Sequence, residues 1–180
     1  MIDVFLRWYP QNSLRNRIAK CVQARLSSLK GVRTHTVFAD VCASKEKFHI
    51  ESKQFAEHNA ESEIYCVIDD DQLPIADDFF EVGAATLANH PEYGMLAGFP
   101  LEYAVHGQPY ADRTEDVIEA HSIGCPYFVR KGTLSFPDGP LRQYDGILSK
   151  VVTDQNLKTG FARKCLYNHI GYGFSQIGYE

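Results

Sequence analysis

The chain has 180 residues, of which 44% are hydrophobic and 23% are charged, a composition typical of one globular domain with its own core. A formal net charge of −5 excludes bulk electrostatic attraction to nucleic acid or to an anionic membrane. The five cysteines are scattered, which favours a reducing compartment over a disulfide framework or a zinc site. No apolar run approaches the roughly 20 residues that span a bilayer. The start of the chain lacks a signal-peptide pattern, so we expect a soluble, cytoplasmic protein.

The first half of the chain alternates between strand-like and helix-like patterns. Residues 2–9 are typical of a strand, and apolar residues three or four apart then predict a helix that ends at Gly31. Residues 32–39 alternate as a second strand, residues 45–59 predict a second helix, and residues 64–68 form a short apolar third strand. This order favours a parallel sheet wound by crossover helices.

The second half of the chain continues the sheet less regularly. Residues 101–119 are polar, and we expect a loop or a short hairpin there. Arg130 and Lys131 follow a strand and are candidates for phosphate contacts. The remaining predicted elements are helices over residues 75–90 and 144–158 and strands over residues 93–100, 121–129 and 161–167.

Three consecutive aspartates, Asp69, Asp70 and Asp71, end the third predicted strand. Their carboxylates repel one another and are costly to bury unpaired, so we expect them near water with a divalent cation. Oxygen ligands suit Mg²⁺, Mn²⁺ or Ca²⁺, and magnesium sites combine one or two carboxylates with substrate phosphates. Ligands of such sheets bind beyond the carboxyl ends of strands, where Tyr9 and Asp40 also lie. The alternative is a solvated acidic loop that merely follows a strand.

The order of these segments resembles the GT-A type of nucleotide-sugar glycosyltransferase, most nearly the inverting family 2. IDDD at the end of the third strand is similar to the Asp-x-Asp motif of that family. The helix and strand after it, the segment SIGCPYFVRKGTL, and YDGILSKVVTDQNLKTGF with the later HIGYGFS carry the rest of the resemblance. It covers nearly the whole chain as a pattern of segments.

The resemblance implies an α/β fold of the GT-A-like, Rossmann-like kind, in a compact version. We therefore expect one domain over residues 1–180, with a mostly parallel sheet flanked by helices. Residues 1–100 would form the nucleotide-binding half, and residues 101–180 would form the half that binds acceptor and metal.

The resemblance also implies a metal site. Asp71 would ligate Mn²⁺ or Mg²⁺ together with the late His169. Asp69 would face the ribose of the nucleotide or a water on the metal, and Asp70, in the middle, could share either role. On the residues alone, His169 could instead be a loop histidine in the glycine-rich turn that follows it.

Nucleotide and acceptor contacts are implied for further residues. Asp40 would accept a hydrogen bond from the base, and Trp8 and Tyr9 would pack against base and ribose, although both aromatics could equally belong to the core. Lys53 is a further candidate for phosphate contacts. Asp145 stands near the position of the general base, here preceded by a tyrosine instead of a second acid, and it could equally cap the helix that it opens.

The function that the resemblance implies is metal-dependent transfer of a sugar from a nucleoside diphosphate sugar, with UDP-sugar as the expected donor, to an acceptor hydroxyl with inversion. The acceptor, whether a glycan, a lipid-linked molecule or another hydroxyl, is not identified by the sequence. One alternative is a degenerate module that binds nucleotide sugars without transfer. Another is a nucleotidyltransferase, although RWYPQNS after the first strand lacks the glycines of a phosphate-binding loop.

Overall fold

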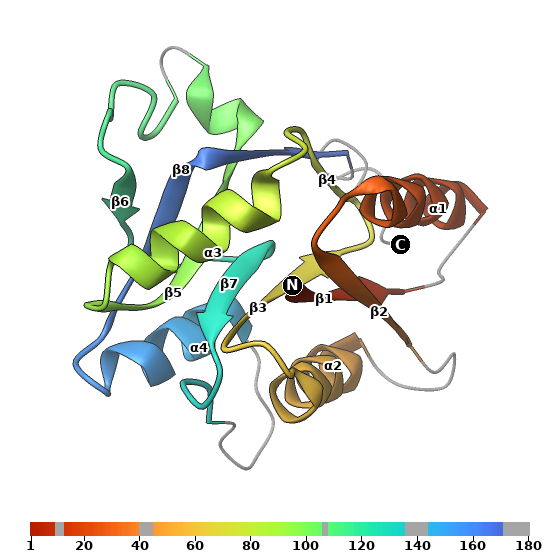
Figure 1. Ribbon diagram of the computed structural model, residues 1–180, viewed down its shortest axis with the longest axis horizontal. Coiled ribbons are helices and arrows are strands. Elements are labelled where there is room, and N and C mark those ends of the chain that lie inside the picture. The colour runs from red at the N-terminus through yellow and green to blue at the C-terminus, as the bar shows by residue number, and fades with distance from the viewer. Residues whose placement is uncertain (10–12, 40–44, 106–107, 136–143, 171–180) are drawn as a thin grey trace.

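The structure, a computed structural model, describes residues 1–9, 13–39, 45–105, 108–135 and 144–170 (Figure 1). Its helices are α1 (Ser13–Ser28), α2 (Lys45–Asn59), α3 (Phe79–Asn89) and α4 (Tyr144–Thr153), with a short 3-10 helix η1 (Leu101–Ala104). Its strands are β1 (Ile2–Trp8), β2 (Val32–Phe38), β3 (Ile64–Asp69), β4 (Gln72–Pro74), β5 (Tyr93–Pro100), β6 (Val117–Glu119), β7 (Tyr127–Arg130) and β8 (Lys158–His169).

All these strands join one sheet, in the order β2-β1-β3-β7-β5-β8-β4, with β6 paired to β8. The predicted α/β class is confirmed, and the sheet is mixed. β1 is parallel to β2 and β3, and β5 is parallel to β8. β7 runs antiparallel between β3 and β5, and β4 and β6 run antiparallel to β8. Strands from both halves of the chain therefore share one hydrogen-bonded sheet.

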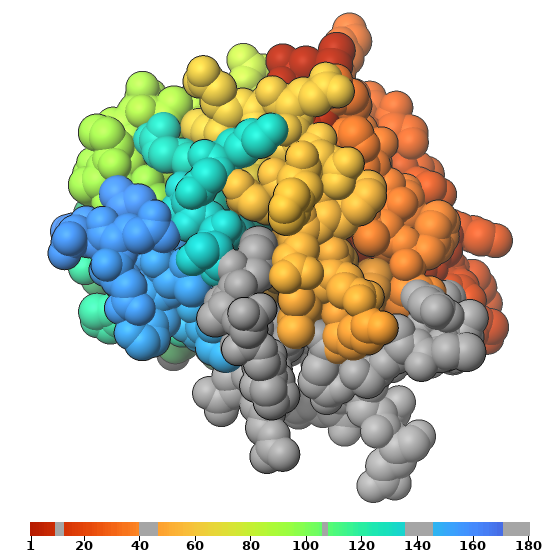
Figure 2. Space-filling view, turned by 90° about the horizontal axis from the view of Figure 1, so that it is seen from below, coloured from red at the N-terminus to blue at the C-terminus, as the bar shows by residue number. Residues whose placement is uncertain are grey.

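Two helical layers cover the sheet, one on each face (Figure 1). Alternate residues of β1 point to opposite faces, as the period of two along a strand requires. Val4 and Leu6 join the apolar cluster under α1 and α3, whereas Phe5 joins the cluster under α2 and α4. Figure 2 looks onto the face that α2 and α4 cover. The crossover helices thus supply both hydrophobic faces of the sheet, as expected for a wound α/β fold.

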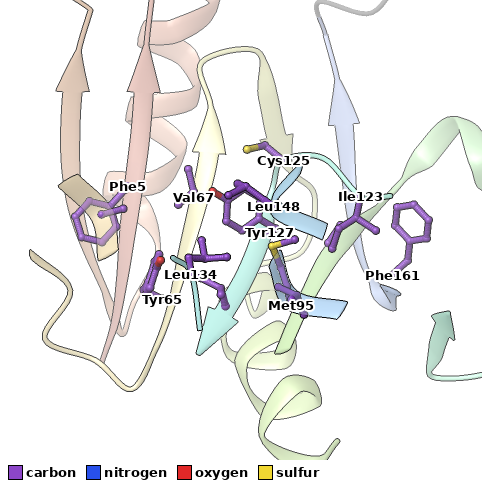
Figure 3. Packing of buried hydrophobic residues seen from close by; sticks show 14 of the residues in the cluster. Phe5, Tyr65, Val67, Met95, Ile123, Cys125, Tyr127, Leu134, Leu148 and Phe161 are labelled. Carbon is purple, nitrogen blue, oxygen red and sulfur yellow. The ribbon is translucent and has the colours of Figure 1, made fainter. Parts of the chain in front are cut away.

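The core under α2 and α4 extends across the sheet from β1 to β8 (Figure 3). Tyr65 and Val67 of β3 and Tyr127 of β7 are buried in it, together with Leu148 of α4. Burial of a large apolar side chain contributes about 1.5–3 kcal/mol, so this cluster is a main source of stability.

Gly83 lets α3 lie directly on the sheet. A Cβ atom built on Gly83 would lie 2.1 Å from the ring of Phe128, which projects from β7 toward that helix. Real Cβ atoms do not approach so closely, so any side chain at position 83 would push α3 away from β7. A glycine inside a helix lowers stability through backbone entropy. The close approach of α3 to Phe128 explains why position 83 is nevertheless a glycine.

Asp3 fixes the beginning of β1 to β2 and to the segment that precedes β3. Its carboxylate is fully buried and accepts from Arg33 Nε at 2.5 Å and Arg33 Nη2 at 2.9 Å. His35 Nε2 lies 2.9 Å from it, and the backbone N–H groups of Glu61 and Ser62 donate at 2.7 and 2.8 Å. Burial by itself raises the pKa of Asp3, but these hydrogen bonds outweigh it and hold that pKa far below its ordinary value.

Several segments differ from the sequence predictions. The predicted strand over residues 121–129 is shorter, since β7 begins at Tyr127, and the predicted helix over residues 144–158 ends at Thr153. Residues 72–74 form the strand β4, which pairs with β8. The helix predicted to begin at residue 75 begins at Phe79 instead. The stretch 101–119, expected as a loop or hairpin, contains η1 and the strand β6. The final strand is longer than predicted and runs from Lys158 to His169. Within the described part of the chain, no helix combines the length and the apolar character needed to cross a membrane.

Candidate active site at the carboxyl end of β3

The aspartate triplet forms the turn between β3 and β4. Asp69 is the last residue of β3, and Asp70 and Asp71 make the turn that leads to Gln72, the first residue of β4. Gln72 pairs with His169 at the end of β8. Pairing of β4 with β8 thereby brings a histidine from the end of the described chain to the carboxyl end of β3.

Asp71 of this turn and His169 at the end of β8 face one another. Asp71 Oδ1 lies 3.5 Å from His169 Nε2, and the side chains are 9% and 26% exposed. The backbone oxygen of Asp71 also accepts from Ile170 N–H at 2.8 Å, which holds the end of β8 against the turn. Burial alone lowers the pKa of His169, but the hydrogen bond to Asp71 and the charges of Asp71 and Asp69 raise it above its ordinary value. The predicted juxtaposition of these two residues is therefore present.

Asp70 faces away from His169, toward β1 and α1. Its Oδ2 accepts from the Tyr9 backbone N–H at 2.8 Å, and its Oδ1 accepts from Arg15 Nη2 at 2.5 Å and Nε at 3.0 Å. Its side chain is 1% exposed. Burial raises the pKa of Asp70, and the hydrogen bonds from Arg15 and Tyr9 offset only part of this effect. We expected that Asp70 could share the role of Asp69 or of Asp71; its carboxylate joins the turn to Arg15 and to the segment after β1.

Asp69 points to the opposite face of the sheet from Asp70 and forms an ion pair with Arg7 of β1. Its side chain is 25% exposed. Burial raises the pKa of Asp69, but the charges of Arg7, His49 and Lys53 outweigh it and bring the pKa below its ordinary value. We expected Asp69 to face the ribose or a water on the metal, and one oxygen of its carboxylate contacts a guanidinium.

Arg7 and Arg15 are the two site residues that the sequence predictions missed. Each carries a guanidinium to one aspartate of the triplet, and Arg15 Nη2 also lies 3.6 Å from Asp71 Oδ2. β1 carries two buried charged residues, Asp3 and Arg7, and a buried charge in a strand is a signal that an opposite charge lies near it. These cations compensate the mutual repulsion of the three carboxylates from within the protein.

Tyr9 and Trp8 have different surroundings. Tyr9, half-buried, follows β1, and its ring centroid lies 5.8 Å from that of Phe48. Trp8 is buried: its Nε1 donates to Asn16 Oδ1 at 3.0 Å, and its ring centroid lies 5.2 Å from that of Phe38. Tyr9 is therefore partly exposed at the carboxyl end of β1, whereas Trp8 packs against α1 and β2.

Lys53, expected to reach phosphate, is fully buried inside the α2 layer. Its Nζ lies 5.5 Å from the ring centroid of Tyr127, and its charge acts on Asp69. The structure therefore makes Lys53 part of the positive surroundings behind Asp69.

Arg130 and Lys131 lie at the wrong end of the sheet for a phosphate contact. β7 is antiparallel to β3, so Arg130 is opposite Ile64, at the beginning of β3. Arg130 Nη2 donates to the Leu87 carbonyl oxygen, and Lys131 Nζ donates to that of Ala60. Asp40 lies outside the described residues, and Asp145 lies in the first turn of α4 with a side chain that is also outside them.

The donor set at this turn fits a divalent ion that has few protein ligands. Neighbouring ligands of an octahedral ion lie roughly 3 Å apart, so Asp71 Oδ1 and His169 Nε2, at 3.5 Å, are near the separation for a shared ion. Among the described residues, no group of three or more His, Cys, Asp or Glu side chains is arranged to hold a metal. Two protein ligands leave the other positions to water and phosphate, as is common for magnesium-type sites.

Comparison by sequence gives no match, either to a known protein family or to a curated protein. Solved structures match over nearly the whole chain. A fragment of S. aureus TarS, residues 1 to 349, has a TM-score of 0.65 at 13% identity and covers 94% of this chain. GalNAc-T7 with UDP, GalNAc and Mn²⁺ has a TM-score of 0.60 at 7% identity and covers 94%. Drosophila β-1,4-galactosyltransferase 7 with manganese, UDP-Gal and xylobiose has a TM-score of 0.55 at 13% identity and covers 98%.

These similarities establish the fold, which is the one that GT-A type glycosyltransferases share. The chain spans 60% of the TarS fragment, 43% of the GalNAc-T7 chain and 74% of the galactosyltransferase chain. The TarS fragment has also been solved with UDP-GlcNAc and with UDP.

Proposed function

We propose that this chain is a glycosyltransferase that moves a sugar from a UDP-sugar to an acceptor hydroxyl, with a divalent cation and with inversion. One observation carries the proposal: Asp71 and His169 lie 3.5 Å apart at the carboxyl end of β3. The turn that holds them belongs to a fold whose solved examples contain UDP-sugars and manganese. Ligands of α/β sheets bind at this edge.

Asp71 and His169 would hold Mn²⁺ or Mg²⁺, which supplies Lewis-acid stabilisation of the departing diphosphate. Asp69, one-quarter exposed at the end of β3, would meet the ribose or a water on the ion. Tyr9 would pack against the nucleoside, and Asp40 would accept a hydrogen bond from the base. These residues bind and orient the donor.

Asp145 is the proposed general base. It would remove the proton of the acceptor hydroxyl as that oxygen attacks the anomeric carbon and the bond to the diphosphate breaks. A carboxylate can act as base at neutral pH when it lies within hydrogen-bond reach of the hydroxyl. One displacement then gives inversion without a covalent intermediate.

Release of UDP from a panel of UDP-sugars tests the proposal. The purified chain is incubated with UDP-glucose, UDP-galactose, UDP-GlcNAc or UDP-GalNAc, with Mn²⁺, with Mg²⁺ or with EDTA. We expect slow hydrolysis of at least one donor, and we expect EDTA to abolish it. Thermal unfolding with UDP and Mn²⁺ reports binding separately, since ligand at 100 times its Kd stabilises by about 2.7 kcal/mol.

The two measurements separate the possible functions. Binding without UDP release from any donor would favour a module that holds nucleotide sugars without transferring them. Absence of both binding and hydrolysis with every nucleotide would refute the proposal. Hydrolysis that persists in EDTA would remove the cation from the mechanism.

A further inference from the structure

Arg7 connects the end of β3 to three other parts of the molecule. It is 3% exposed, inside the sheet, and it forms an ion pair with Asp69. Its Nη1 donates to His49 Nδ1 of α2 at 2.7 Å, and its Nη2 donates to Cys125 Sγ at 3.3 Å. In the parallel register of β1 and β3, Arg7 is the partner of Asp69, so both side chains lie on the same face of the sheet.

A second chain of hydrogen bonds also links Asp69 to Cys125. The backbone N–H of Asp69 donates to Gln72 Oε1 at 2.9 Å, and Gln72 Nε2 donates to the Cys125 carbonyl oxygen at 2.5 Å. Gln72 is 3% exposed. Figure 3 shows Cys125 toward the carboxyl ends of β1 and β3, beyond Tyr127. Both the carboxylate and the backbone of Asp69 are therefore held from inside the protein.

The orientation of Asp69 matters for an anionic ligand. Its carboxylate remains one-quarter exposed although one oxygen contacts Arg7. Without Arg7, a partly buried negative charge next to Asp70 and Asp71 would repel an approaching diphosphate, and water would compete for the carboxylate. Lys53 adds positive charge on the same side, yet its Nζ is directed to the ring of Tyr127.

We propose that Arg7 is a positioning residue of the donor site, an inference that rests on the proposed function. Its guanidinium holds the Asp69 carboxylate from the protein side, so that the exposed part of Asp69 stays directed to the nucleotide. It also neutralises the charge that would oppose binding of the diphosphate. Arg7 itself is buried and does not contact the donor; it acts through Asp69.

A double-mutant cycle on UDP binding in Mn²⁺ tests this role. Calorimetry gives the Kd for wild type, Arg7→Gln, Arg7→Lys, Asp69→Asn and the Arg7→Gln/Asp69→Asn double variant. Residues that orient a ligand-contacting group typically change affinity about 10- to 100-fold, so we expect Arg7→Gln to raise Kd by at least about tenfold. Arg7→Lys should recover part of the affinity. In the Asp69→Asn background, Arg7→Gln should change Kd less than about twofold, because the two residues act as a unit.

Arg33→Gln is the matched control, because it breaks another Arg–Asp pair, with the buried Asp3, at the opposite end of β1. It should lower the urea midpoint of the ligand-free protein and leave Kd unchanged. If Arg7→Gln does not fold, Arg7→Lys and the double variant, which removes both charges together, still complete the comparison.

The results distinguish this inference from the proposed function. A wild-type protein that binds UDP, with Kd unchanged in Arg7→Lys and Arg7→Gln, would overturn the positioning role alone. Equal effects of Arg7→Gln in the wild-type and Asp69→Asn backgrounds would do the same. A wild-type protein that binds no UDP would overturn the proposed function, and the role of Arg7 with it.

Discussion

Replacing Asp3 by asparagine should destabilise the fold strongly, far from the candidate site. The buried carboxylate of Asp3 accepts from two atoms of Arg33 and from two backbone N–H groups, with His35 Nε2 also at 2.9 Å. Asparagine keeps one side-chain oxygen and replaces the second oxygen, which also accepted hydrogen bonds, by an NH₂ group. Whichever way the amide turns, a donor then faces the guanidinium of Arg33.

The expected loss follows from the burial of the two partners. Breaking a buried ion pair by removing one partner costs about 3–5 kcal/mol. Arg33 is 35% exposed, so water can rehydrate its guanidinium, and we expect a value near the lower limit, about 3 kcal/mol. For a chain of this length, each kcal/mol lowers Tm by about 2–4 °C, which gives a decrease of about 6–12 °C.

The effect should also depend on pH in a defined direction. The pKa of Asp3 is lower in the folded protein than in the unfolded chain, so its contribution to stability is fully present above the unfolded value, about 3.9. It is lost progressively as the pH falls from that value toward the much lower pKa of the folded protein, because protons then bind Asp3 in the unfolded chain but not in the folded one. The stability difference between wild type and Asp3→Asn should therefore be complete at pH 7 and shrink in acid.

Urea unfolding at pH 7 and at pH 3, followed by the fluorescence of Trp8, measures both effects. Trp8 is the one tryptophan of the chain and is 7% exposed, so unfolding changes its surroundings. Asp116→Asn is the control, because it removes an exposed carboxylate that pairs with Lys164 at 2.8 Å, and it should change the midpoint little. Equal midpoints for wild type and Asp3→Asn at pH 7, or a difference that persists undiminished in acid, would refute the reasoning.

Three further predictions concern the site and the packing beside it. Asp71→Asn should abolish the Mn²⁺-dependent part of the thermal stabilisation by UDP; an undiminished Mn²⁺ effect would exclude Asp71 as a ligand. Asp145→Asn should leave the Kd for UDP unchanged and reduce sugar transfer by about 10²–10⁴-fold, and wild-type turnover would assign the base elsewhere. Gly83→Ala should destabilise by about 1–3 kcal/mol, because its Cβ would meet the ring of Phe128 at 2.1 Å; an unchanged urea midpoint would show that α3 moves freely.

The part of the fold that the sequence predicted is the part that depends on local pattern. Apolar periodicity placed the first two strands and helices and the strand into Asp69, since burial on one face imposes that period. Strand direction is not a local property, because an apolar run reads the same in either direction. β7 was therefore recognised as a strand, while its antiparallel course, which carries Arg130 to the far end of the sheet, was not.

The candidate site, too, was predicted from the sequence only in part. The resemblance predicted that Asp71 and His169 lie together, and they do, because β4 pairs with β8. The charge partners were missed because they depend on strand register: Arg7 is opposite Asp69 only when β1 and β3 are aligned. Arg7 in the predicted first strand, followed two strands later by three acids, was the available signal.

The three aspartates of the triplet differ in what surrounds them, and the difference explains why all three can coexist. Asp69 and Asp70 each have a guanidinium, from Arg7 and Arg15 respectively, whereas Asp71 Oδ1 faces the imidazole of His169. Asp71 Oδ2 shares the guanidinium of Arg15 with Asp70, at 3.6 Å from Arg15 Nη2, so each carboxylate of the triplet has a cationic neighbour. Asp70 meanwhile accepts from the Tyr9 backbone N–H, so it fixes the position of the proposed nucleoside contact relative to the proposed metal ligand. The middle aspartate, whose own side chain is 1% exposed, thus connects the two proposed binding elements from inside the protein.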